Sequence, residues 1–172
     1  RLKGVERWME ALATLLRRGL TDLRSLVIGR GDSRRWHHRA EHLGIAHALT
    51  FVGPSDRVRE FHHAADLLIH PTYYDPCSRV VLEALAAGLP CVTTRWDGAS
   101  EMIVDGHNGF VLSEPDDVAG LTVLVDRLRD AALRRSMSES ARTVRDQISM
   151  ARHAAEMLKL YEEVARSKEP RR

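Results

Sequence analysis

Residues 66–94 have the sequence DLLIHPTYYDPCSRVVLEALAAGLPCVTT, which contains a strand, a polar loop, a helix and a second strand in that order. The apolar run at 66–70 stops at Pro71, and residues 78–87 have apolar side chains at helical spacing before the next apolar run at 91–94. Two short strands joined by a helix predict a right-handed crossover between parallel strands. This stretch therefore predicts an α/β domain.

The same alternation continues on both sides of this stretch. We expect further strands at 25–28, 48–52 and 110–112, helices at 5–16, 33–43 and 55–65 (the last capped by Ser55 or Asp56), and a helical turn at 98–103. The run SLVI at 25–28 is almost wholly apolar, which is typical of a strand buried on both faces. From residue 116 only helical patterns remain. The expected fold is a Rossmann-like, doubly wound parallel sheet with extra C-terminal helices. Residues 1–145 would form the α/β domain, and residues 146–172 a C-terminal helix and charged tail.

The composition excludes several classes of protein. The 172 residues include 26 Lys and Arg against 24 Asp and Glu, spread along the chain, so there is no basic stripe for nucleic acid. No apolar run approaches the roughly 20 residues that a membrane-spanning helix needs. Two cysteines, Cys77 and Cys91, are too few for a disulfide scaffold and suit a reducing compartment. We expect a globular cytoplasmic protein.

The ligand site is expected where the carboxyl ends of the parallel strands meet. The loops at that edge are predicted at 29–33, 71–78 and 95–101. The first begins GRG at 29–31, like a dinucleotide fingerprint, but Arg34 stands where the third glycine of that fingerprint belongs. We therefore expect no nicotinamide or flavin dinucleotide and interpret these glycines as turn residues.

The nine histidines raise the question of a metal site. Neighbouring residues on a helix point in different directions, so the pairs at 37–38 and 62–63 cannot chelate one ion, and only His38 and His42 have i, i+4 spacing. No acidic or cysteine partner completes a ligand set, so these histidines are predicted to lie on solvated helix surface and no metal is expected. His70, at the end of its strand, is the histidine expected near the ligand site.

Two carboxylates follow the strand that ends at His70: Asp75 lies in the loop and Glu83 in the next helix. Glu83 has apolar neighbours, among which an unpaired carboxylate is costly, so we expect it to have a polar partner. That partner is either a vicinal diol of a ligand or Arg79 at i−4. Backbone amides at the helix start favour anionic oxygens. Cys77, with no base assigned beside it, is interpreted as a packing residue rather than a nucleophile.

Short motifs occur through the chain in a fixed order. They are KG at 3–4, VIGRG at 27–31, LG at 43–44, TFVG at 50–53, DPCS at 75–78, LEA at 82–84, AGLP at 87–90, GASE at 98–101 and DGHNG at 105–109. Their order and spacing resemble the C-terminal, donor-binding half of the retaining GT-B glycosyltransferases, in the group 1 family that includes the lipopolysaccharide-core glucosyltransferases. The resemblance implies a nucleotide-sugar-binding domain.

The resemblance also implies a role for each matched residue. Asp75 would be the catalytic carboxylate that binds hydroxyls of the transferred sugar, Lys3 would bind the donor diphosphate, and Glu83 the ribose. The other donor-binding residues that it implies are Gly31, Cys77, Ser78, Arg79, Gly98 and Ala99. A lysine and oriented amides stabilise a departing nucleoside diphosphate, so no cofactor or metal is expected.

The implied enzyme is a hexosyltransferase that takes a nucleotide sugar and transfers the hexosyl group, with retention, to a glycan, lipopolysaccharide or lipid. The acceptor would bind an N-terminal domain absent from this chain, so the fragment alone is expected to be inactive. The full-length enzyme is expected in the cytoplasm, associated with the inner face of the cell membrane. In this architecture the last helix crosses to the other domain, so the face of Ala154, Leu158 and Tyr161 is expected to be partly exposed.

Four residues depart from the family pattern. Asp75 replaces a glutamate, Cys77 replaces an aromatic residue, and Ser78 and Asp97 replace glycines. Ser78 suits the N-cap of the helix that follows it. Two other functions stay open. One is a sugar-nucleotide epimerase of the same architecture, and the other is a non-catalytic nucleotide-sugar-binding module in which the departures from the family pattern reflect a loss of donor binding.

Overall fold

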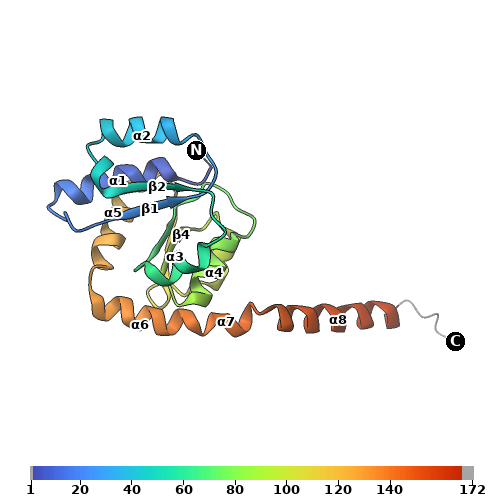
Figure 1. Cartoon of the computed structure of the whole chain (residues 1–172). Helices are drawn as coiled ribbons and strands as arrows, with labels where there is room; N and C mark the ends of the chain where they lie inside the picture. The colour runs from blue at the N-terminus through green and yellow to red at the C-terminus, as the bar shows by residue number, and fades with distance from the viewer. Residues whose placement is uncertain (1, 168–172) are drawn as a thin grey trace.

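Five short parallel strands lie at the centre of the described chain (Figure 1). They are β1 Ser25–Ile28, β2 Leu49–Gly53, β3 Leu68–His70, β4 Cys91–Thr94 and β5 Gly109–Leu112. The computed structural model describes residues 2–167, apart from the side chain of Ser33. β1 pairs with β2, and β4 lies between β3 and β5. The predicted α/β class with parallel strands is confirmed, and the expected sheet is hydrogen-bonded as two ladders.

Helices connect the strands and continue to the end of the described chain. They are α1 Val5–Arg17, α2 Ser33–His42, α3 Val58–Ala64, α4 Arg79–Ala87, α5 Val118–Arg127, α6 Ala131–Arg142, α7 Val144–Gln147 and α8 Met150–Ser167, with 3-10 turns η1 Ala46–Ala48 and η2 Gly98–Met102. Each strand and helix expected from the sequence is present, with ends within a few residues of the prediction. Within residues 2–167, no helix combines the length and apolar character needed to cross a membrane.

Helix α3 starts later than expected. The prediction that Ser55 or Asp56 caps it is wrong, because the N-cap is Arg57. The hydroxyl of Ser55 instead accepts the amide of Arg57 at 3.0 Å. This hydrogen bond closes a turn before the helix, a local arrangement that competes with helix formation.

Helices cover both faces of the β3–β5 ladder, as a doubly wound fold requires. On one face, Leu15 of α1 and Leu121 of α5 pack with Val92 of β4. On the other face, Leu85 of α4 packs with Cys91, in a cluster that α6 and α7 complete. Burial of these apolar side chains is the main stabilising contribution to the fold. Burial also raises the pKa of the Cys91 thiol, so Cys91 is an uncharged packing residue.

The β1–β2 ladder is covered on one face only. Val27 and Phe51 pack toward α1 and α2, whereas Leu26 and Val52 are exposed. Alternate side chains of a strand point to opposite faces, so this pattern is that of a half-buried strand. The prediction that residues 25–28 are buried on both faces is therefore wrong.

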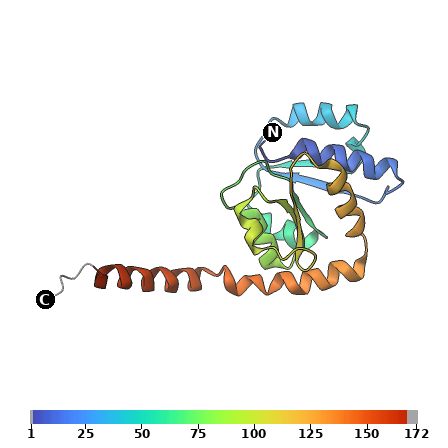
Figure 2. The ribbon, with the colours of Figure 1, turned by 180° about the vertical axis from the view of Figure 1, so that it is seen from behind.

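Helix α8 extends away from the strands and the other helices (Figures 1 and 2). None of its residues is buried. The exposed apolar side chains of α8 include Leu158 and Tyr161, so the prediction of partial exposure for the face of Ala154, Leu158 and Tyr161 is confirmed. The charged tail expected at 168–172 lies outside the described residues.

Candidate functional site

Backbone hydrogen bonds join the loops after β3 and β4 at the edge where the ligand site is expected. The amide of Asp75 donates to the carbonyl of Trp96 at 3.0 Å, and the amide of Gly98 donates to the carbonyl of Asp75 at 2.9 Å. The loops are so close that a Cβ on Gly98 would lie 1.9 Å from the carbonyl oxygen of Pro76. Only glycine fits there, because any side chain would push the two loops apart.

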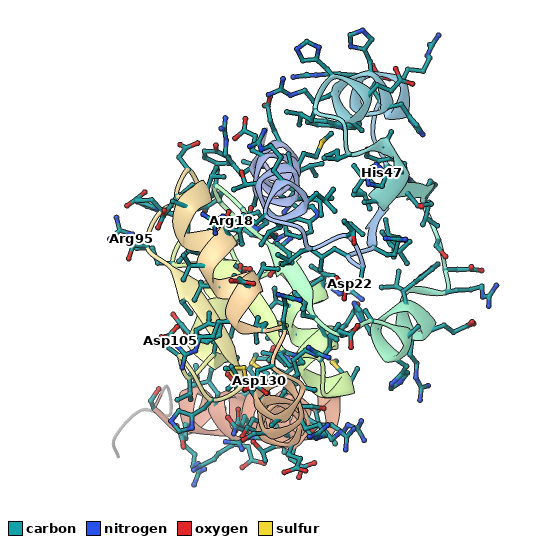
Figure 3. The ribbon with its side chains drawn as sticks, turned by 90° about the vertical axis from the view of Figure 1, so that its left-hand side faces the viewer. Arg18, Asp22, His47, Arg95, Asp105 and Asp130 are labelled. Carbon is teal, nitrogen blue, oxygen red and sulfur yellow. The ribbon has the colours of Figure 1, made fainter. Side chains whose placement is uncertain are left out.

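Figure 3 labels Arg95, which belongs to the loop after β4 and marks the end of the ladder where that loop lies. Arg95, which follows β4, lies at the opposite end of the ladder from Asp105, which precedes β5. A separate open groove beside α2 is lined by Glu6, Arg35, Trp36, His38, Arg39 and His42. That groove contains none of the predicted site residues, whereas the two joined loops contain several of them.

Lys3 and Asp75 form an ion pair between Nζ and Oδ2. The carbonyl of Leu2 accepts the amide of Tyr73 at 2.8 Å and the hydroxyl of Thr72 at 3.0 Å, which attaches the segment before α1 to the loop after β3. The side chain of Asp75 is 14% exposed and that of Lys3 50%. The structure thus brings together the residues that the family resemblance assigns to the diphosphate and the sugar.

The Asp75 carboxyl has a pKa below its ordinary value. Burial raises this pKa, but the hydrogen bond and positive charge of Lys3, the amide of Cys77 and the charge of His70 together lower it by more. The amide of Cys77 adds to the lowering by donating to Oδ1 at 3.3 Å. Asp75 is therefore an ionised carboxylate at neutral pH.

Replacing Asp75 with asparagine should lower stability at neutral pH and have less effect in acid. A carboxyl whose pKa is lowered by folding stabilises the folded state above its unfolded pKa, here the ordinary value of 3.8, and loses that contribution as the pH falls through the folded pKa. Urea unfolding of the wild type and Asp75→Asn between about pH 7 and about pH 3 measures the difference. That difference should shrink below about pH 4.

The matched variant is Lys3→Gln, which removes the other partner of the ion pair and should show the same pH trend. A difference in free energy of unfolding that stays constant, or grows, as the pH falls would contradict the ion-pair account.

His70 lies beside Asp75, and its side chain is 13% exposed. Its Nε2 is 3.8 Å from Asp75 Oδ2, too far for a hydrogen bond, and has no hydrogen-bond partner among the described residues. Burial lowers the pKa of the imidazole and the charge of Lys3 lowers it further, while the charges of Asp97 and Asp75 oppose this. His70 is therefore neutral at pH 7.

Asp97 is a fully buried carboxylate that connects the two loops. Its Oδ1 accepts the amides of Ser78 at 3.1 Å and Ala99 at 3.0 Å. Its Oδ2 accepts the hydroxyl of Thr93 at 2.9 Å and the hydroxyl of Ser78. Four donor groups thus satisfy a charge that burial would otherwise make costly. In the sequence, Asp97 is recognisable only as a residue that replaces a glycine of the family pattern. Ser78 also replaces a glycine, and this pair of replacements is the signal that could have predicted their contact.

The prediction that the side chain of Ser78 caps α4 is wrong. Ser78 occupies the N-cap position, but its hydroxyl makes no capping bond and donates to Asp97. The carboxylate of Asp97 serves both helical starts instead, since it accepts amides at the beginning of α4 and of η2. The amides of Ser78 and Ala99, expected to bind donor oxygens, therefore donate to Asp97 in this structure.

Glu83 lies on the half-exposed side of α4, where its side chain is 47% exposed. Arg79 Nη2 donates to Glu83 Oε1 at 3.3 Å. The prediction of an apolar environment for Glu83 is wrong, because Ala84 and Leu85, its sequence neighbours, point into the core on another face of the helix. The sequence left two possible partners for Glu83, a ligand diol or Arg79, and in the structure Glu83 pairs with Arg79.

The prediction of solvated surface is wrong for His62. This residue of α3 is buried where α3 packs against α4, while His63 is exposed. Burial lowers the pKa of His62, and the charge of Glu83 opposes the shift. His62 is therefore a neutral packing residue.

Arg7 of α1 connects three segments near Lys3. Its Nε donates to the hydroxyl of Tyr73 at 3.0 Å and lies 3.1 Å from Asp116 Oδ1, and its Nη1 pairs with Glu10 at 2.6 Å. The hydroxyl of Tyr73 also donates to Asp116. The sequence gives no local signal for Arg7, because two of its partners lie far along the chain.

The other predicted site residues divide between the two ladders. Cys77, Ser78, Gly98 and Ala99 lie in the joined loops after β3 and β4. Cys77 is exposed there, so its interpretation as a packing residue is wrong. Gly31 lies between β1 and α2, so it belongs to the other ladder. In the part of the chain that the structure describes, no group of three or more His, Cys, Asp or Glu side chains could hold a metal ion.

Residues 1–144 match the family model described as Glycosyl transferases group 1. The lipopolysaccharide glucosyltransferase WaaG of Escherichia coli K12 is 37% identical over 145 residues, which cover 84% of this chain and 39% of WaaG. The crystal structure of WaaG, described as a glycosyltransferase involved in lipopolysaccharide biosynthesis, has a TM-score of 0.79 at 36% identity and covers 84% of this chain and 40% of that chain. The chain thus spans about two fifths of the length of this relative.

Two more distant structures show the same fold. The C-terminal domain of the group 1 glycosyl transferase LpcC of Francisella tularensis has a TM-score of 0.76 at 21% identity, covering 86% of this chain and 80% of that one. HepE of Anabaena, solved in complex with UDP, has a TM-score of 0.77 at 22% identity, covering 92% and 45%. The family match confirms the resemblance drawn from the sequence: the chain belongs to the group 1 glycosyl transferases and has the fold of a GT-B C-terminal domain.

Proposed function

We propose that this chain is the donor-binding domain of a retaining hexosyltransferase and that it binds a nucleotide-diphosphate sugar at the loops after β3 and β4. The observation that carries this proposal is the ion pair of Lys3 and Asp75, which places a cation and a carboxylate together at the carboxyl ends of parallel strands. Membership of the group 1 family supports it, as does the relative WaaG, which is named a lipopolysaccharide glucosyltransferase.

A nucleotide sugar offers both members of this ion pair a new partner. Its diphosphate oxygens are anionic and suit the ammonium of Lys3, while its sugar hydroxyls suit the carboxylate of Asp75, which only accepts hydrogen bonds. When the bond between sugar and diphosphate breaks, negative charge develops on the leaving oxygen, and the charge of Lys3 stabilises it. Lys3 therefore acts on the leaving group and Asp75 on the transferred sugar.

The other donor-binding roles are assigned to residues of the loops after the strands and of α4. Glu83 accepts hydrogen bonds from the two ribose hydroxyls. To do so it gives up its solvent-exposed ion pair with Arg79. The loops that contain Cys77 and Gly98 line the sugar and phosphates, together with the loop of Gly31. Asp97 positions the two loops through the amides of Ser78 and Ala99. No metal or cofactor has a role in this proposal, since the positive charge of Lys3 stabilises the leaving group.

The complete reaction also needs an acceptor site, which we place on a domain outside this chain. This chain spans about two fifths of WaaG, so the donor domain alone is expected to bind the nucleotide sugar and to turn over little. The acceptor is a glycan, lipopolysaccharide or lipid in this proposal, and the enzyme acts at the cytoplasmic face of the cell membrane.

Lys3→Met should weaken nucleotide-sugar binding by about 10- to 100-fold, the range expected for a lost hydrogen bond to a charged group. Isothermal titration calorimetry of the 172-residue chain with UDP-glucose, UDP-N-acetylglucosamine and GDP-mannose identifies the donor and measures this loss. The first of these is the primary probe, because WaaG is named a glucosyltransferase and HepE was solved with UDP.

Lys159→Met is the matched control, since Lys159 is an exposed lysine on α8 and should bind the nucleotide sugar like the wild type. If the wild type bound none of the three donors, or Lys3→Met bound as tightly as the wild type, the proposed function would be wrong.

A further inference from the structure

The imidazole of His70 contains a buried nitrogen that is unsatisfied in the described structure. Its Nε2 is hidden from solvent and has no hydrogen-bond partner among residues 2–167. Asp75 Oδ2 lies 3.8 Å from this nitrogen, beyond hydrogen-bond distance. A buried polar group without a partner costs free energy, so such an atom in a binding site points to a ligand atom that completes it.

The backbone holds His70 in place. His70 pairs with Thr93 in the β3–β4 ladder, and its carbonyl accepts the amide of Thr72 at 2.7 Å. The imidazole therefore extends from the end of a strand whose backbone is held in the ladder.

Asp75 is held as firmly as His70. Its amide donates to the carbonyl of Trp96, its carbonyl accepts the amide of Gly98, and its carboxylate contacts Lys3 and the amide of Cys77. The backbone of Asp75 is therefore held by the loop after β4, while its carboxylate changes partner when Lys3 turns to the diphosphate.

We propose that Nε2–H of His70 and Oδ2 of Asp75 bind one and the same hydroxyl group of the transferred sugar. A hydroxyl oxygen accepts one hydrogen bond and donates another, and it forms both at about 2.8 Å. Two such bonds meeting at one oxygen are compatible with the 3.8 Å between Nε2 and Oδ2, which is too long for a direct bond. The inference rests on the proposed function and adds His70 to the residues that select the sugar.

The charges around His70 fit this role. The carboxylate of Asp75 accepts hydrogen bonds and cannot donate, so the hydroxyl must donate its proton to Asp75. The hydroxyl then has no proton left for the imidazole, which must therefore be the donor in their hydrogen bond. A neutral imidazole with its proton on Nε2 supplies that donor. Asp97, Lys3 and Asp75 are the charged groups that act on His70, and burial together with Lys3 favours the neutral ring. The pair therefore requires a hydroxyl and discriminates against a hydrogen or a methyl group at that sugar position.

His70→Leu should weaken binding of UDP-glucose by about tenfold and leave binding of UDP within about twofold of the wild type, since only the sugar contacts the imidazole. Titration calorimetry with both ligands measures the two losses. His70→Gln, which keeps a donor, should recover part of the affinity. His47→Leu, at the amino end of β2 (Figure 3), is the control and should bind both ligands normally.

UDP-glucose analogues that each lack one hydroxyl identify the shared group. One analogue should bind the wild type and His70→Leu equally, because its missing hydroxyl is the one that His70 contacts. If His70→Leu fails to fold, 15N-histidine NMR of the wild type replaces it: the Nε2 resonance of His70 should shift with UDP-glucose and not with UDP.

Three results would overturn the inference. Equal weakening of UDP and UDP-glucose would show that His70 acts through the protein structure, and unchanged binding of UDP-glucose would show that the sugar does not contact it. Both leave the proposed function intact. Failure of the wild type to bind either UDP or UDP-glucose would overturn the proposed donor and this inference together.

Discussion

Asp97→Ala should lower the free energy of unfolding by about 3–5 kcal/mol. The substitution removes the acceptor for the amides of Ser78 and Ala99 and for the hydroxyls of Ser78 and Thr93. Each buried donor left without a partner costs about 1–3 kcal/mol, and rotation of the two hydroxyls recovers part of the sum. Urea unfolding followed by circular dichroism measures the loss.

Asp97→Asn is the matched variant and should cost only about 1–2 kcal/mol, because its amide oxygen can still accept both backbone amides. Asp32→Ala, at the exposed N-cap of α2, removes a carboxylate that accepts one amide, that of Arg35, and should cost about 1 kcal/mol. A loss below about 1 kcal/mol for Asp97→Ala would contradict the view that this carboxylate joins the two loops.

Gly4→Ala should lower the free energy of unfolding by about 2–4 kcal/mol and also weaken nucleotide-sugar binding by more than about tenfold. Gly4 has a φ of 69°, and a Cβ there would lie 1.9 Å from the carbonyl oxygen of Pro71. Because this contact is with backbone, the segment of Leu2 and Lys3 must move away from the loop after β3. Lys3 then loses its position beside Asp75.

Gly19→Ala separates backbone strain from the steric contact. Gly19 has a φ of 90°, but no atom lies within 4 Å of the position that its Cβ would take. This variant should cost about 1 kcal/mol and bind nucleotide sugar like the wild type. If Gly4→Ala resembled Gly19→Ala in both stability and binding, the close approach of Gly4 to Pro71 would have no functional consequence.

The strands and helices were predictable because their limits are local properties of the chain. Pro71 ends β3, Gly88 ends α4, and the periodicity of apolar residues distinguishes helix from strand. The class of fold follows from the alternation of these elements. The meeting of Lys3 with Asp75 is not local, and it was anticipated only through the family motifs.

Side-chain environments were harder to predict, because they depend on which distant element covers a residue. Leu26 is exposed since no described helix covers its face of β1, and His62 is buried because α3 packs against α4. The bonds of Asp97 to Ser78 and Ala99 join two loops, and no pattern within either loop predicts that contact.

The most direct test of the donor site is to add UDP-glucose, or the best donor of the calorimetric panel, to the 15N-labelled chain and map the amides whose NMR signals shift. The account predicts shifts at Lys3, Cys77 and Gly98, with the signals of α8 unchanged. Shifts confined to the groove beside α2, at residues such as Trp36, or no shifts at all, would contradict it.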